Sequence, residues 1–122
     1  MNEINRNDMN EISEALSSMI SRVENTKSSF KEGSSQYSLQ RNRLKALKIA
    51  LDLVQKPDEL RYSQADLLAA EAPIVSLISK SEKARQKLDP DSWQYAMLTH
   101  NLTALNAVLP ILRKAIKEGT TQ

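Results

Sequence analysis

Apolar residues recur at alternating steps of three and four along four segments of the chain, which is the spacing of one helix face. The strictest row is a seven-residue repeat in the first segment: Met9, Ile12, Leu16, Met19, Val23, Thr26 and Phe30. The second row, between Leu44 and Val54, is flanked by further apolar positions, which is typical of a well-buried helix. The third runs from Leu67 to Leu88, and the fourth segment carries two rows between Trp93 and Ile116. The pattern therefore predicts four helices.

Residues that start and stop helices divide these segments. Gly33 and Pro57 are placed where the first two helices should end, and Ser63, with an acidic residue three positions later, is typical of a helix start. For the other two helix starts we expect Ser34 and Asp91 as N-caps. Two prolines lie inside predicted helices: Pro73 should kink or divide the third, and Pro110 should kink the fourth.

The two halves of the chain align without a gap when the sequence is shifted by 58 residues. From Asp8/Asp66 to Lys56/Lys114 there are 13 identities in 49 pairs, and many other pairs are apolar in both copies. Shared heptads could align two amphipathic helices, but they do not explain a polar Ser-x-Gln-Tyr block that begins at Ser34 and again at Ser92. That block either starts a helix in each half or forms a duplicated contact site. The pattern favours an internal duplication of one helical hairpin.

These observations predict an all-α fold, an antiparallel four-helix bundle built from two tandem helical hairpins. The whole chain, residues 1–122, would be one domain, with the first hairpin at about 4–56 and the second at about 62–117. A single hairpin of this length is too small to bury its own apolar faces. We therefore expect two hairpins packed across a pseudo-two-fold axis, with the second and fourth helices at the centre.

Composition adds several expectations. Apolar residues make up 40% and charged residues 26%, which is ordinary for a globular protein, and there is no cysteine for a disulfide, a thiolate nucleophile or a zinc–thiolate site. No apolar run approaches the length of a membrane span, and the polar first ten residues do not resemble a secretion signal, so we expect a cytoplasmic location and no membrane contact. The net charge of +2 predicts no strong attraction to nucleic acid.

Two groups of basic residues are candidates for partner binding. Arg41, Lys45 and Lys48 form a basic stripe on the second helix, and Lys80, Lys83 and Lys87 form a lysine cluster on the third. Each group is either a solvated helix face or a site for an acidic partner, protein or nucleic acid. Interleaved aromatic residues, which single-strand binding would require, are missing.

The only histidine, His100, is followed two positions later by a leucine, as in histidine phosphotransfer helices. Asn101 stands where an acidic neighbour would help that histidine act as a nucleophile, and the equivalent position of the first half is Asn42. No second histidine is present for a di-metal site, and no phosphate-binding loop or catalytic triad pattern occurs. We expect no cofactor, no metal site and no enzyme activity.

The sequence thus favours a protein-interaction module, such as an adaptor, an inhibitor or a chaperone-like bundle, that presents helix faces to another protein. Association with nucleic acid through the basic residues is the first alternative, and phosphotransfer through His100 is the second. The protein could be a monomer or a homodimer. The strict row of the first helix could pack within the chain or against another protomer.

Overall fold

The computed structural model describes residues 6–57 and 61–120, which form four helices and no strand. They are α1 (Arg6–Lys27), α2 (Ser35–Gln55), α3 (Gln64–Gln86) and α4 (Trp93–Thr120). An all-α fold with antiparallel packing contacts is therefore confirmed. The predicted limits of the hairpins are close, although α4 extends to Thr120 and residues 4–5 of the first predicted hairpin lie outside the described residues.

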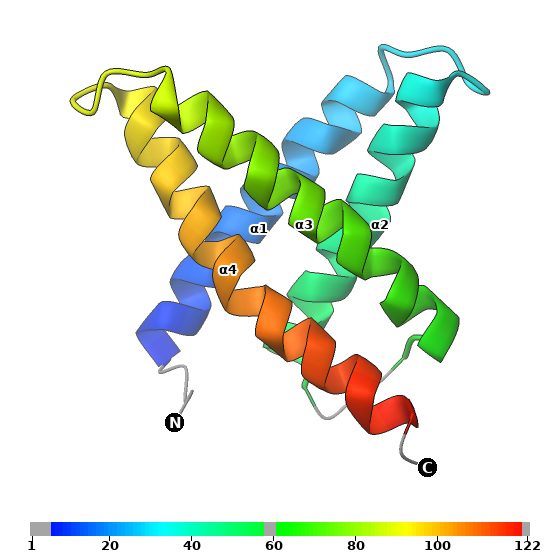
Figure 1. Cartoon of the computed structure of the whole chain (residues 1–122). Coiled ribbons are helices and arrows are strands. Elements are labelled where there is room, and N and C mark those ends of the chain that lie inside the picture. Colours follow the sequence, from blue (N-terminus) through cyan, green and yellow to red (C-terminus); the bar gives the residue numbers. More distant parts are fainter. Residues whose placement is uncertain (1–5, 58–60, 121–122) are drawn as a thin grey trace.

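The two hairpins cross each other instead of lying along one axis. Figure 1 shows the α1–α2 hairpin and the α3–α4 hairpin as the two arms of an X, with the two hairpin turns at separate tips. α2 and α4 each pack against all three other helices, whereas α1 and α3 do not contact each other within the described residues. The expectation that the second and fourth helices form the centre is confirmed.

The core is made of aliphatic side chains from all four helices, as the apolar rows predict. Leu16, Leu47, Leu67, Ile74 and Leu105 are all inaccessible to solvent. The strict row of α1 supplies Ile12, Leu16 and Met19 to this core, so it packs within the chain. Three members of the predicted rows were misplaced by the pattern, because Thr26 and Ala84 are exposed and Trp93 is 70% exposed.

Serine side chains cap three of the helices. Ser34 accepts a hydrogen bond from the Tyr37 N–H (3.1 Å), as predicted, and Ser63 accepts one from the Asp66 N–H (3.1 Å). At the start of α4 the prediction of Asp91 is wrong: Ser92 accepts from the Tyr95 N–H at 3.2 Å. The caps of α2 and α4 are thus the same residue type, 58 positions apart.

The tyrosines that follow these caps pack in the same way in both hairpins. The Lys27 ammonium lies 5.8 Å from the ring centre of Tyr37, and the Arg85 guanidinium lies 5.5 Å from that of Tyr95. In each case the cation comes from the last turn of the preceding helix, so the contact joins the two helices of the hairpin next to their turn. This arrangement agrees with the interpretation of the Ser-x-Gln-Tyr block as a helix start.

The hairpin turns themselves differ. Gly33 ends the first turn with a φ of 91°, in the left-handed region that favours glycine. Asp91 holds the equivalent place in the second turn, and no residue other than glycine has a positive φ in the described ranges. The two hairpins therefore have matching caps at the starts of α2 and α4 but different turn conformations.

Neither proline divides its helix. α3 continues through Pro73 and α4 through Pro110. Each ring removes one N–H, which leaves the carbonyl four residues earlier without a helical donor. Those carbonyls belong to Ala69 and Asn106, which are exposed residues, so water can bond to the freed oxygens.

No helix in residues 6–57 and 61–120 is both long and apolar enough to cross a membrane.

We predict equal core effects at equivalent positions of the two hairpins. Leu47→Ala and Leu105→Ala, both at fully buried side chains, should each lower the free energy of unfolding by about 2–5 kcal/mol, because each leaves a cavity in the core. Urea denaturation followed by circular dichroism measures the change. Leu39→Ala on α2 is the control, since this side chain is 44% exposed and its truncation should have a much smaller effect. A small loss at either core leucine would contradict the packing described.

Candidate functional site

The basic stripe of α2 is largely used within the fold. The Lys45 ammonium lies 2.8 Å from a carboxylate oxygen of Asp66 on α3, and the Lys48 ammonium lies 3.8 Å from Glu24 on α1. Arg41 is exposed and has no ion-pair partner among the described residues. Two of the three cations therefore fasten α2 to its neighbours. Because both pairs are about half exposed, each stabilises the fold only slightly.

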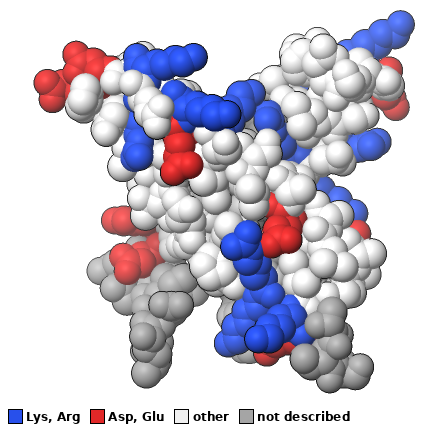
Figure 2. All heavy atoms as spheres, viewed as in Figure 1, with Lys and Arg blue, Asp and Glu red and all other residues white. Residues whose placement is uncertain are grey.

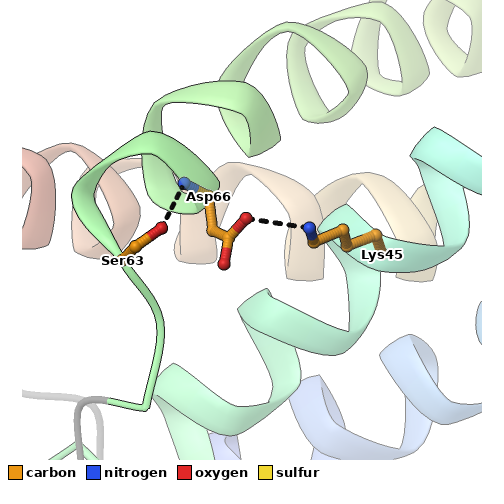
Figure 3. A network of polar contacts seen from close by, with 3 residues as sticks. All are labelled: Lys45, Ser63 and Asp66. Carbon is orange, nitrogen blue, oxygen red and sulfur yellow. Dashed lines mark hydrogen bonds and ion pairs between the residues drawn. The ribbon is translucent and has the colours of Figure 1, made fainter.

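Figure 3 shows how the stronger of these pairs is organised at the start of α3. Ser63 caps the helix through the Asp66 N–H, and the Asp66 side chain turns toward Lys45 on α2. The hydrogen bond from Lys45 is the main cause that holds the pKa of Asp66 below its usual value, and hydrogen bonds from Ser63 lower it further. This small network ties the first turn of α3 to the middle of α2.

The lysine cluster is placed differently. Lys80, Lys83 and Lys87 lie near the end of α3, all three are exposed, and none has a carboxylate partner among the described residues. Figure 2 shows several basic side chains near the turn between α3 and α4, together with acidic ones at its tip. Lys83 in the last turn of α3 and Lys87 at its C-cap are placed favourably for the helix dipole. The structure does not join the basic stripe and the lysine cluster, since the stripe lies around the middle of α2 and the cluster lies near the turn between α3 and α4.

The most unusual surface was missed by the sequence analysis. We call it the outer face of α3, and all seven of its residues are exposed and uncharged: Ala65, Leu68, Ala69, Ala72, Val75, Ser76 and Ser79. Leu68 is 51% exposed and Val75 is 40% exposed. They are two of the four large apolar residues that are exposed in the described chain, and they lie two helical turns apart on one side of α3. In Figure 2 part of the middle of the molecule is correspondingly white, with acidic and basic side chains beside it.

A signal for this face is present in the sequence. Between Leu67 and Ser79 only Glu71 is charged, so α3 has no strongly polar side in this stretch. Helical periodicity identifies the buried row of such a helix but does not say how much of the remaining circumference is covered. Packing against α2 and α4 buries Leu67, Ala70 and Ile74 and leaves the opposite side bare.

A groove of about 400 Å³ adjoins the outer face of α3. It lies between α2 and α3, and its lining includes Leu39, Ala46, Ile49, Ala69, Ala72 and Pro73. Lys45 and Asp66 provide its charged groups, and these are paired with each other. The groove is thus mostly apolar with one ion pair at its edge.

The equivalent side of α1 is polar. The residues 58 positions before Leu68, Ala69, Ala72 and Val75 are Asn10, Glu11, Glu14 and Ser17, and all four are exposed. The same place in the same kind of hairpin is therefore compatible with charged residues. The apolar outer face of α3 is not a requirement of the fold.

Among the residues whose burial the structure describes, two polar side chains are buried, and they lie 58 positions apart in the two hairpins. Arg43 on α2 is 7% exposed, and Asn101 on α4, 58 residues later, is 5% exposed. The Arg43 Nε has no hydrogen-bond partner, and burial lowers the pKa of its guanidinium. A buried donor without a partner destabilises the fold.

Tyr62 lies between the hairpins and contacts α2. Its hydroxyl donates a hydrogen bond of 2.5 Å to the Asp52 carboxylate, and this bond is the main cause that raises the pKa of Tyr62 to about 12. The contact joins the start of the second hairpin to the end of the first.

His100 is exposed on α4. The described residues contain no group of three or more histidine, cysteine, aspartate or glutamate side chains that could hold a metal ion.

Comparisons with protein-family models, with curated proteins and with solved structures find no match for this chain. Its function must therefore be inferred from its own surface.

Replacement of the buried arginine should stabilise the protein. We expect Arg43→Met to raise the free energy of unfolding by about 1 kcal/mol or more, because it removes a buried donor without a partner and keeps much of the side-chain volume. Arg41→Met is the matched control on the same helix, where the exposed side chain should change stability by less than about 0.5 kcal/mol. Equal effects of the two substitutions in urea denaturation would argue against a buried Arg43.

The hydrogen bond of Tyr62 predicts a loss of stability at high pH. The folded pKa of about 12 lies above the ordinary value of 10.0, so the contribution is fully present below pH 10 and disappears as the pH rises toward 12. Urea midpoints measured across this range should fall more steeply for the natural protein than for Tyr62→Phe. Parallel curves would show that Tyr62 does not retain its proton in the folded state.

Proposed function

We propose that this protein is a protein-interaction module that binds another polypeptide through the outer face of α3. The observation that carries the proposal is the pair Leu68 and Val75, two large apolar side chains exposed on one side of a helix whose other exposed neighbours are uncharged. Single exposed apolar residues are ordinary on proteins, but a contiguous apolar patch marks an interaction surface.

The comparison with α1 supports this proposal. An exposed apolar side chain contributes little to the stability of the fold. The α1–α2 hairpin has polar residues at the equivalent positions of α1. Burial of Leu68 and Val75 against a partner would remove apolar area from water, which is the main favourable term in association. The neighbouring α2–α3 groove offers an apolar surface into which a partner's side chain can reach.

The alternatives stay predictions. Nucleic-acid binding through the basic stripe is less favoured, because Lys45 and Lys48 have carboxylate partners within the chain. The exposure of His100 is the one observation that supports phosphotransfer through this residue. The proposed module needs no catalytic group and no cofactor.

We also infer that the fold arose by duplication of one hairpin. Matched serine caps, the matched cation–tyrosine contacts and the buried polar residues at equivalent places support this inference. Lys27 and Arg85, which make those contacts, are also 58 residues apart. The proposed binding face would then belong to one copy of the hairpin only.

The proposal predicts that charges placed on the outer face of α3 abolish binding. The tagged natural protein should retain a stoichiometric protein partner, including any untagged copy of itself, from its native cell lysate at high salt. Leu68→Asp/Val75→Asp should lose that partner, because burial of unpaired carboxylates is strongly unfavourable. The matched control is Asn10→Asp/Ser17→Asp, which adds the same charges at the equivalent exposed positions of α1 and should retain the partner.

Retention of the partner by the α3 variant would overturn the proposal. Recovery of nucleic acid alone, lost as salt rises, would move the function to the basic residues.

A further inference from the structure

The outer face of α3 has a nearly palindromic order about its middle residue, Ala72. Leu68 lies four positions before Ala72 and Val75 three positions after it. Ala65 and Ser79 lie seven positions away on the two sides. A helix of the same sequence that runs in the opposite direction therefore presents matching residues at matching heights, with Leu68 beside Val75 of the other helix.

We propose that the partner of this face is a second copy of the chain, packed with the two α3 helices antiparallel and a two-fold axis near Ala72. This inference rests on the proposed function, because it names the occupant of the same surface. In such a dimer each copy covers the apolar residues of the other, and the assembly closes at two subunits. The uncharged, mostly small neighbours of Ala72 let the helix axes approach closely.

Charge selects this orientation. Asp66 lies near the start of α3, and the lysine cluster lies near its end. An antiparallel copy brings Asp66 of one chain to the level of Lys80 of the other, whereas a parallel copy would place the two lysine clusters side by side. Antiparallel helices also bring opposite ends of the two helix dipoles together.

The side chains needed for this contact are free to make it. Lys80 has no carboxylate partner within the described residues, and the Asp66 carboxylate, which Lys45 and Ser63 already contact, has two oxygens that can accept a further hydrogen bond. Asp66 also lines the α2–α3 groove. The groove therefore provides the space through which Lys80 of the second copy can reach this carboxylate.

α1 does not offer a competing surface. Glu11 and Glu14 occupy the places that Ala69 and Ala72 hold on α3, so an α1–α1 pair would bring four carboxylates together near the axis. The flanking Asn10 and Ser17 also supply no apolar area. Self-association is thus specific to the second hairpin, and it should give dimers and not longer chains.

Two experiments test the dimer with the chain of 122 residues, and the absence of cysteine from its sequence makes the second of them, disulfide formation, specific to introduced cysteines. Sedimentation equilibrium should show a reversible dimer of the natural protein, and Leu68→Asp/Val75→Asp should raise its dissociation constant by about 100-fold or more, because the introduced carboxylates are desolvated without partners. Asn10→Asp/Ser17→Asp should leave the constant unchanged. Circular dichroism of both variants checks that the helices remain folded.

Disulfide formation then tests the register. Ala72→Cys should form a disulfide-linked dimer under mild oxidation, and Glu14→Cys, at the equivalent exposed position of α1, should not. Mixed Ala65→Cys and Ser79→Cys proteins should link to each other, whereas Ala65→Cys alone should not, because its two copies would lie roughly 20 Å apart. Linkage of Ala65→Cys to itself would refute the antiparallel arrangement.

The two proposals fail in different ways. A protein that stays monomeric at every concentration, yet loses a different protein partner in the Leu68→Asp/Val75→Asp variant, would overturn the dimer and leave the interaction module intact. A monomer that captures no protein through this face would overturn both. A dimer that is insensitive to the α3 substitutions would place the self-contact elsewhere and also refute the inference.

Discussion

The fold depends on the burial of an apolar surface on α2 that is too wide for one neighbouring helix to cover. Its buried residues occupy an arc of about 220° at 100° per residue, whereas those of α1 occupy about 140°. α1 can cover only one side of such an arc, since a typical contact stripe spans little more than 100°. The remaining side requires α3 and α4. The second hairpin is therefore part of the folding unit of the first.

The crossed arrangement follows from this need. Each hairpin places its central helix, α2 or α4, against both helices of the other hairpin, and the outer helices α1 and α3 stay apart. In Figure 1 the arms diverge toward the two turns, so that burial is concentrated at the crossing. The fully buried residues Leu47 and Leu105, which are 58 residues apart, illustrate this concentration. The tips are secured by local contacts instead, namely serine caps and cations over tyrosine rings.

Most of the helix positions could be predicted because they depend on local rules. The spacing of apolar residues identified the core rows, and Ser34 and Ser63 marked helix starts. The predictions failed at positions where burial or capping depends on the tertiary structure and not on the local sequence. Trp93 belongs to an apolar row of α4 by spacing, yet it lies in the first turn beyond the reach of the core. Asp91 and Ser92 are both good caps, and only the backbone path of the turn selects the serine.

The candidate site was less accessible to sequence reasoning. The predicted binding site consisted of basic residues. Lys45 and Lys48, however, form ion pairs with residues of other helices, which no local sequence pattern reveals. The outer face of α3 was overlooked because an apolar residue on a mostly apolar helix is ordinarily assigned to the core. Its exposure depends on the directions from which α2 and α4 approach.

The outer positions of α1 are polar, whereas the outer face of α3 is apolar, and the requirements of folding do not explain this difference. Substitutions at exposed helix positions usually change stability by less than about 0.5 kcal/mol, so folding alone does not hold these positions to one residue type. If the inferred duplication is correct, the two outer faces began with the same residues and have since diverged, to Glu11 and Glu14 on one side and Ala69 and Ala72 on the other. An exposed apolar face favours unwanted association, which charged residues prevent at no loss to the fold. Its presence on α3 agrees with the partner that we propose for this face.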